Sequence, residues 1–199
     1  MSNYFSNRAP SFKPHNINCG KIPAYAYRKT LKEALADQEL TAKEALALYE
    51  DMLTIREFEE MIVKLRTGAY PACAGYDYRG PTHVSIGQEA TAVGACAGMR
   101  YDDNITSTHR GHGDSLAKGC AAIRGMSLDE LRERLPWVEA KKRDELMEAG
   151  LEDHVYRAIA ELFGKEDGYC KGRGGGMHIA DFRVGHLGAN AIVGGGVPI

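Results

Sequence analysis

Long hydrophobic runs are missing from the sequence. The longest apolar stretches, such as Ala90–Met99, are short and consist largely of alanine and glycine, whereas a helix needs roughly 20 apolar residues to cross a bilayer. An excess of one charge is missing too, because the formal net charge is −2. Without a basic field to attract polyanions, we expect neither a membrane nor a nucleic-acid partner.

Paired cysteines are also missing. The cysteines are Cys19, Cys73, Cys96, Cys120 and Cys170. Their number is odd, their spacing is wide and no C-x-x-C pair occurs, which argues against a disulfide framework. Reduced thiols are typical of an intracellular, reducing compartment. We therefore expect a cytoplasmic protein.

The first residues lack acidic side chains. Met1–Lys32 contains no Asp or Glu but several lysines and arginines, a composition that organelle transit peptides share. The same stretch holds three prolines and has no clear amphipathic period. These features favour a loosely structured basic arm, which we assign to residues 1–40.

The remaining residues, 41–199, have the size and composition of one globular domain. Thr41 and Glu44 form a capping-box pattern that predicts a helix start. Apolar residues then recur mostly three or four positions apart, with Asp51 among the polar residues between them. These are Ala45, Leu48, Met52, Ile55, Ile62 and Leu65. Gly68 is suited to end this amphipathic helix.

Small residues fill the next region. Ala90–Gly98 can be helical only if it packs tightly in the interior, because alanine and glycine supply little apolar area. Asn104–Thr108 is β-prone, and His109–Gly113 has the composition of a turn. Asp114 can open the helix that follows.

A charged segment covers about residues 126–153. It begins with a second capping box, Ser127 to Glu130, and acidic residues outnumber basic ones. We interpret it as exposed helices that form an excursion from the main fold. Val155–Phe163 then returns to apolar helical spacing, and the chain after Gly164 is rich in glycine.

Helices that alternate with short β-prone runs, without an internal repeat, favour an α/β fold. We expect a doubly wound parallel sheet with flanking helices. Val197–Ile199 places a proline where a helix would begin. The sheet is therefore expected to be incomplete at the C-terminus.

The densest group of functional side chains is Thr106–Asp114, which places two imidazoles and a guanidinium at a strand-to-helix turn. Ligands bind at such turns in α/β sheets, and arginine with free helix amides suits a phosphorylated cofactor. Two alternatives remain. The histidines can cap backbone groups of a surface turn, or His109, His112 and Asp114 can bind zinc.

A second group, Tyr169–His178, combines a glycine-rich loop with two cations and a histidine. Its spacing fits neither a phosphate loop nor a dinucleotide fingerprint, so a flexible or tightly folded active-site loop is the better interpretation. His83 precedes the Gly-Gln-Glu-Ala run. Without other information, His83 is interpreted as a buried histidine that forms a hydrogen bond where a helix begins.

Four consecutive blocks resemble the α subunits (E1 component) of thiamine-diphosphate-dependent 2-oxo-acid and acetoin dehydrogenases, in their N-terminal part. The blocks are His83–Ala90, Thr106–Gly113, Glu161–Asp181 and Gly188–Pro198. The Ser-Thr-His-Arg-Gly-His-Gly form is similar to acetoin dehydrogenases somewhat more than to pyruvate dehydrogenases. The resemblance implies the thiamine-diphosphate-binding fold.

The resemblance also implies a cofactor site. His109 and Arg110 would face the diphosphate of thiamine diphosphate, and Ala191 and Val193 would contact its aminopyrimidine through backbone groups. Magnesium would accompany the diphosphate. Its ligands in the family belong to a Gly-Asp-Gly segment and a later Asn, which we expect beyond residue 199.

Two histidines become catalytic candidates through the same resemblance. His83 stands where the family has a histidine near the substrate. His112 would line the same pocket and donate a proton or hydrogen bond to a developing oxyanion. The implied reaction decarboxylates a pyruvate-like 2-oxo acid or cleaves acetoin, and passes the acyl group to a lipoyl-bearing acyltransferase.

Partners are implied as well. An E1 β subunit or β-like domain would supply the glutamate that activates the pyrimidine, so we expect the isolated chain to be inactive and to be aggregation-prone or need a partner. One alternative is a truncated non-catalytic fragment or partner-binding module of the same family. Another is a small metalloprotein that uses the histidines.

Overall fold

The computed structural model describes Lys13, Gly20, residues 28–71, Gly75, Tyr78 and residues 83–193. The chain divides into two compact units, Met1–Glu39 and Leu40–Ile199. The predicted helix start at Val197–Ile199 lies outside the described residues, as does most of the basic arm.

The described end of the first unit contains a helix, α1 (Leu31–Ala36). The Thr30 hydroxyl accepts a hydrogen bond from the Glu33 amide, and the Glu33 carboxylate accepts one from the Thr30 amide. The expectation of a loose arm over residues 1–40 is therefore wrong for this stretch. Thr30 and Glu33 carry the same capping-box signature that predicts the next helix.

The second unit begins with the predicted long helix, α2 (Ala42–Arg66). Its capping box at Thr41 is present, and the helix stops before Gly68, whose φ of +70° is left-handed. Asp51 was expected on the solvent-facing side of this helix, but it is buried. It is 5% exposed and forms an ion pair of 2.9 Å with Arg124, a partner from a distant part of the sequence.

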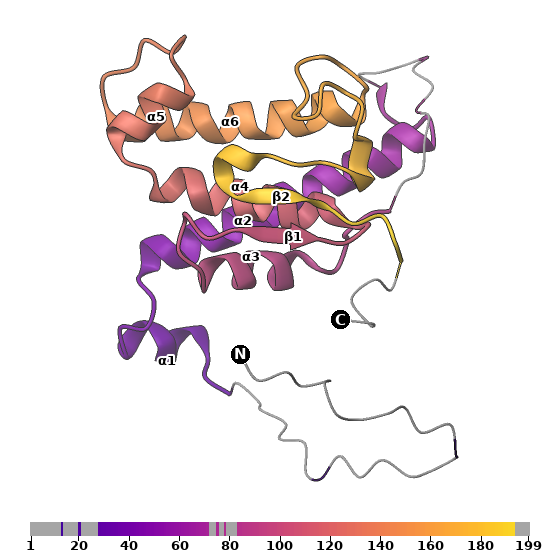
Figure 1. Cartoon of the computed structure of the whole chain (residues 1–199). Coiled ribbons are helices and arrows are strands. Elements are labelled where there is room, and N and C mark those ends of the chain that lie inside the picture. The colour runs from indigo at the N-terminus through magenta and orange to yellow at the C-terminus, as the bar shows by residue number, and fades with distance from the viewer. Residues whose placement is uncertain are drawn as a thin grey trace. The chain divides into compact units, whose positions relative to one another are not determined.

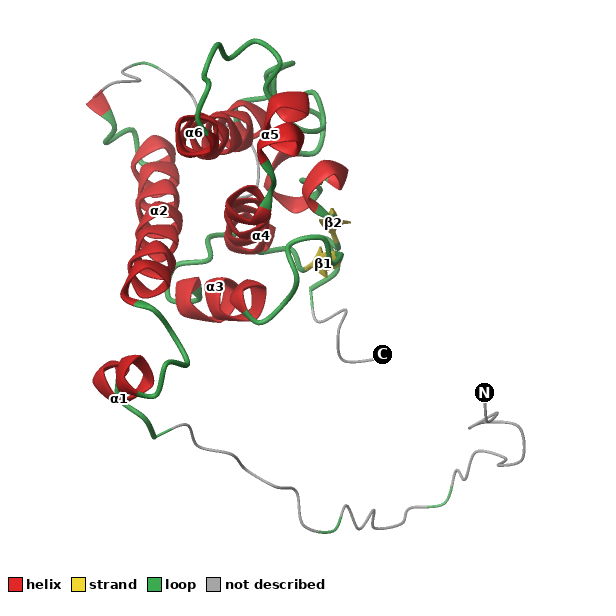
Figure 2. Ribbon diagram, turned by 90° about the vertical axis from the view of Figure 1, so that its left-hand side faces the viewer, coloured by secondary structure: helices red, strands yellow, loops and turns green. Residues whose placement is uncertain are grey.

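Helix α4 (Gly111–Gly125) lies at the centre of the second unit, with α2, α3 (Glu89–Ala97), α6 (Arg143–Leu162) and the strands around it (Figure 2). Most of its residues are buried. The small-residue helix predicted at Ala90–Gly98 forms as α3, but it buries only one face because it packs on the outside of α2 and α4. The helix that is enclosed on most sides is α4.

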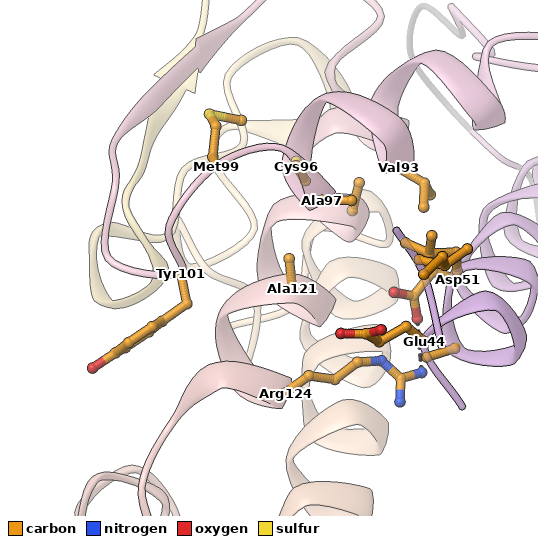
Figure 3. A pocket seen from close by; sticks show the side chains of 13 residues that line it. Glu44, Asp51, Val93, Cys96, Ala97, Met99, Tyr101, Ala121 and Arg124 are labelled. Atoms are coloured by element: carbon orange, nitrogen blue, oxygen red, sulfur yellow. Dashed lines mark hydrogen bonds and ion pairs between the residues drawn. The ribbon is translucent and has the colours of Figure 1, made fainter. Parts of the chain in front are cut away.

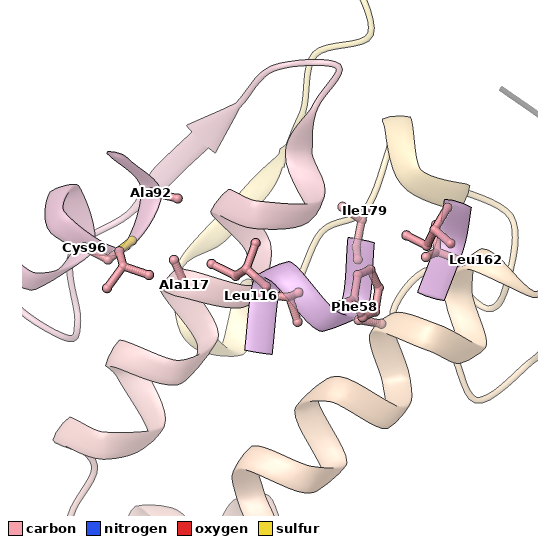
Figure 4. Close-up of a cluster of buried hydrophobic side chains, with 11 residues drawn as sticks. Phe58, Ala92, Cys96, Leu116, Ala117, Leu162 and Ile179 are labelled. Atoms are coloured by element: carbon pink, nitrogen blue, oxygen red, sulfur yellow. The ribbon is translucent and has the colours of Figure 1, made fainter. Parts of the chain in front are cut away.

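The main hydrophobic core joins α2, α3, α4 and α6 (Figure 4). Its members include Phe58, Leu116 and Leu162, and Ile179 enters from the chain that follows the glycine-rich loop. A fully buried leucine or isoleucine contributes roughly 1.5–3 kcal/mol. This core packs the second turn of α4, with Leu116 and Ala117, against α2.

The charged segment at 126–153 forms α5 (Leu128–Arg134) and most of α6. Its helices were expected to be exposed, but only their polar faces are. Leu131 and Leu146 are 0% exposed and share a second core with Ile123 of α4. The segment packs on the C-terminal half of the central helix.

Two short strands, β1 (Ile105–Ser107) and β2 (His186–Ala189), form a parallel pair. The register pairs the first residue of β1 with His186, and an irregularity follows before the strands end. The described residues thus form helices with a small parallel sheet (Figure 1), consistent with the α/β class. The doubly wound topology stays a prediction.

No helix in the described part of the chain is long and apolar enough to span a membrane. Cys96, Cys120 and Cys170 are free thiols, as predicted, whereas Cys19 and Cys73 fall outside the described residues.

Candidate functional site

The candidate site lies where the two parallel strands end. His109 and Arg110 follow β1, and Ala191 and Val193 follow β2. A backbone hydrogen bond of 2.9 Å joins the first residue after β2 to the last residue of β1. The four residues predicted to bind the cofactor therefore start from the same edge of the strand pair, the edge at which α/β proteins bind ligands.

Arg110 is the N-cap residue of α4, which begins three residues before the predicted opening at Asp114. Its guanidinium donates a 2.7 Å hydrogen bond to the carbonyl of Val84. Ser85 fixes the same turn, because its hydroxyl donates to the Arg110 carbonyl at 2.8 Å and accepts from the Gly113 amide at 3.4 Å. The sequence did not single out Ser85, whose role depends on a contact across 25 residues.

The segment that carries His83 is anchored to α2. Arg56 donates to the Glu89 carboxylate at 2.7 Å, and the Gly87 amide donates to it at 3.0 Å. The hydrogen bond from Arg56 lowers the pKa of Glu89 to about 2. Glu89 is therefore ionised at neutral pH and ties this segment to the long helix.

His83 and His109 lie against each other. Their ring centroids are 5.1 Å apart and the rings are nearly perpendicular, at 78°. Both residues are half-buried, and Nδ1 of His109 is buried without a hydrogen-bond partner among the described residues. Since an unsatisfied buried polar atom is costly, this nitrogen is suited to meet a ligand.

His112 occupies the interior rather than the open face of the turn. It is 3% exposed, and its Nδ1 lies 3.0 Å from a carboxylate oxygen of Glu59, which is itself 0% exposed. Its Nε2 faces Gly176, where an added Cβ would come within 1.9 Å. The sequence did not single out Glu59, because its partner His112 is 53 residues away.

Glu161 organises the glycine-rich loop. Its carboxylate is buried and accepts backbone hydrogen bonds of 2.7–2.9 Å from Cys170, Gly172, Gly174 and Gly175. The loop is thus tightly folded, one of the two forms expected, and these four amides already serve an anion. They are not available to a phosphate.

The zinc alternative finds no support in the described part of the chain, which contains no group of three or more His, Cys, Asp or Glu residues that could hold a metal ion. His109, His112 and Asp114 are neighbours in sequence only. His112 turns inward to Glu59, whereas His109 turns towards His83.

A cavity of about 250 Å³ lies elsewhere, between α2, α3 and α4 (Figure 3). Val93, Cys96 and Ala121 line its apolar side, and the Asp51–Arg124 ion pair borders it. Since Ala121 and Arg124 belong to the last turns of α4, the cavity is distant along this helix from the turn at Arg110. It is not the candidate site.

A buried histidine connects α6 to the glycine-rich loop. Nε2 of His154 donates to the Ser115 carbonyl at 3.1 Å, and Nδ1 accepts from the Tyr169 hydroxyl. Both ring nitrogens are therefore satisfied in the neutral form. Burial lowers the pKa of His154 to about 4.

This histidine predicts a pH dependence of stability. The unfolded chain binds a proton below a pH of about 6.5 that the native state excludes. The free energy of unfolding should be nearly undiminished at pH 7 and fall towards pH 4, by about 2 kcal/mol from His154 alone between pH 7 and 5. Urea unfolding at pH 7 and 5 measures this. His154→Asn should show a smaller loss on acidification, and an unchanged loss would contradict the assignment.

Comparison with known proteins identifies similar proteins whose names state their function. The chain is 42% identical over 158 residues to the α subunit of acetoin:2,6-dichlorophenolindophenol oxidoreductase from Bacillus subtilis, which covers 79% of this chain and 35% of the relative. The subunit of that name from Cupriavidus necator is 34% identical over 77% of this chain and 34% of the relative. No protein-family model matches the chain.

Subunits of another dehydrogenase match as well. The chloroplastic pyruvate dehydrogenase E1 component subunit alpha-3 from Arabidopsis thaliana is 29% identical over 93% of this chain and 35% of the relative. The chain therefore spans about a third of the length of these relatives.

Proposed function

The chain belongs to the family of E1 α-type subunits of acetoin and pyruvate dehydrogenases, of which it spans a part, and we propose that it forms the diphosphate-binding side of a thiamine-diphosphate site. The observation that carries the proposal is the convergence of His109, Arg110, Ala191 and Val193 at one end of the parallel strands. When bound, thiamine diphosphate supplies the electron sink for cleavage of a bond next to a ketone.

The donors at this edge fit an anionic group. The Arg110 side chain makes no capping bond to the first turn of α4, and this helix end carries a partial positive charge. Arg110 and His109 directly precede this helix, and Nδ1 of His109 is unpartnered among the described residues. We propose that Arg110 and His109 bind the diphosphate with the help of the helix amides.

The remaining site residues have separate roles in the proposal. Ala191 and Val193 would hold the aminopyrimidine through their backbone groups. His83, in contact with the ring of His109, would face the substrate. His112 would present Nε2 to the site from beneath Gly176, with Glu59 fixing its orientation. The proposed role of His112, hydrogen-bond or proton donation to a developing oxyanion, needs Nε2 to reach the substrate past Gly176.

We propose that other polypeptide segments complete the enzyme. We propose that the magnesium ligands lie elsewhere in a full subunit, as the resemblance implies. A β subunit or β-like domain would complete the site, and a lipoyl-bearing acyltransferase would accept the acyl group. We propose acetoin rather than pyruvate as the substrate, because the relative that is 42% identical is named for acetoin.

Arg110→Ala tests the proposal. Loss of one charge-assisted contact should cost about 1.5–3 kcal/mol and raise the Kd for thiamine diphosphate roughly tenfold to a hundredfold. Calorimetric titration of the complete subunit in the presence of magnesium measures the Kd. Arg132→Ala, which removes an exposed arginine of α5 that is 52% accessible, is the control and should leave the Kd unchanged. An unchanged Kd in a folded Arg110→Ala variant would remove this residue from the site.

A further inference from the structure

The glycine-rich loop is built around an internal anion. Concave arrangements of successive backbone amides bind phosphates and other anions in many proteins. Here the anion is a side chain of the protein itself, because the Glu161 carboxylate at the end of α6 accepts four hydrogen bonds from the loop. It is 0% exposed.

The loop backbone depends on such a partner. Lys171 and Gly172 have successive left-handed φ angles of +57° and +69°, and a non-glycine residue in that region persists only when its surroundings hold it. A Cβ at Gly174 would lie 2.8 Å from the carbonyl oxygen of His178. The turn is therefore closed tightly on itself, with Glu161 at its centre.

The closed loop rests on the first turn of α4. A Cβ at Gly176 would reach Nε2 of His112 at 1.9 Å, and the Gly176 carbonyl oxygen is 3.8 Å from where a Cβ of Gly111 would stand. Gly111 and His112 are the first residues of α4 after Arg110. The loop thus covers the helix end that carries the candidate site.

We propose that Glu161 is a positioning residue, whose buried carboxylate closes the glycine-rich loop over the first turn of α4 and so holds His112 in place. Its effect on activity rests on the proposed function. Its effect on the loop and on His112 does not, and can be measured without cofactor.

The test compares the full chain with Glu161→Ala, Glu161→Gln and the control Glu148→Ala, which removes an exposed glutamate of the same helix. Trypsin should cleave after Lys171 and Arg173 at least about tenfold faster in Glu161→Ala than in the wild type, while cleavage after Lys142 serves as the internal reference. Glutamine, which can accept with one oxygen only, should give an intermediate rate. Circular dichroism confirms that each variant is folded.

The second part of the test adds acetate to the variants. Acetate should slow cleavage of Glu161→Ala, because a free carboxylate can enter the space and accept the four amide bonds, and it should have no effect on Glu148→Ala. The ¹⁵N signals of the His112 ring should shift in Glu161→Ala and return towards the wild-type positions with acetate. Unchanged cleavage, or faster cleavage with unchanged His112 signals, would overturn the proposal. If the Glu161 variants show these effects but the complete wild-type subunit does not bind thiamine diphosphate, the proposed function alone is refuted.

Discussion

Gly172→Ala is expected to lower the free energy of unfolding by more than about 3 kcal/mol. A Cβ at this position would lie 2.2 Å from the carbonyl carbon of Gly164 and 2.6 Å from the amide nitrogen of Lys165. Both are backbone atoms, so no side-chain rotation relieves the contact. The left-handed φ of +69° adds its own cost for a residue with a side chain. Urea unfolding followed by circular dichroism measures the loss.

Gly68→Ala is the matched control. Its φ of +70° is the same within a degree, but a Cβ there has no atom within 4 Å. Only the backbone preference is lost, so the expected cost is about 1–2 kcal/mol. Equal losses in the two variants would show that the close approach of the loop to Gly164 does not exist in solution.

Alanine at His83 or at His112 should lower turnover roughly a hundredfold or more, while the Kd for thiamine diphosphate changes little. The reason is that both side chains are proposed to act on the substrate, whereas Arg110 and His109 are proposed to bind the diphosphate. Turnover is measured in the complete subunit assembled with the proposed β subunit, as acetoin- or pyruvate-dependent reduction of 2,6-dichlorophenolindophenol.

The control for these histidines is His178→Ala, because His178 is exposed and its side chain has no proposed role. His112 is buried against Glu59, so its substitution also removes packing, and the free energy of unfolding of each variant must be compared with its turnover. Full activity in both His83→Ala and His112→Ala would reject the assignment.

The helices could be predicted from the sequence because their signals are local. The pairs Thr41 with Glu44 and Ser127 with Glu130 start α2 and α5 as the capping pattern requires, and Gly68 follows the end of α2. The β-prone run before His109 forms β1. Each of these features is decided by a few neighbouring residues.

Buried carboxylates could not be placed in the same way. Asp51, Glu59 and Glu161 interrupt apolar helical spacing, and a charged residue there is ordinarily assigned to the solvated face. Their partners are Arg124, His112 and the loop amides. Such partners are distant in sequence, so only the packed structure brings them together.

The candidate site was predictable in part for a related reason. The turn at His109 and Arg110 has a chemical composition that points to an anion, and the parallel strands bring the start of α4 against Ala189, where a Cβ at Gly111 would lie 3.0 Å from the Ala189 Cβ. Burial of His112 was not predictable from its neighbours, because it depends on the loop that Glu161 closes and on Gly176. Ser85 likewise acts through a contact that the sequence does not display.

The central claim is that the first turn of α4 and the residues after β2, rather than the glycine-rich loop, meet the cofactor diphosphate. Titration of the ¹⁵N-labelled full subunit, including the segment expected to hold magnesium, with thiamine diphosphate and magnesium tests it directly when followed by amide NMR spectra. The account predicts the largest shifts at Gly111, His112 and residues 190–193, with little change at Gly172 and Gly174. Shifts centred on Gly172 and Gly174, or none at the start of α4, would contradict it.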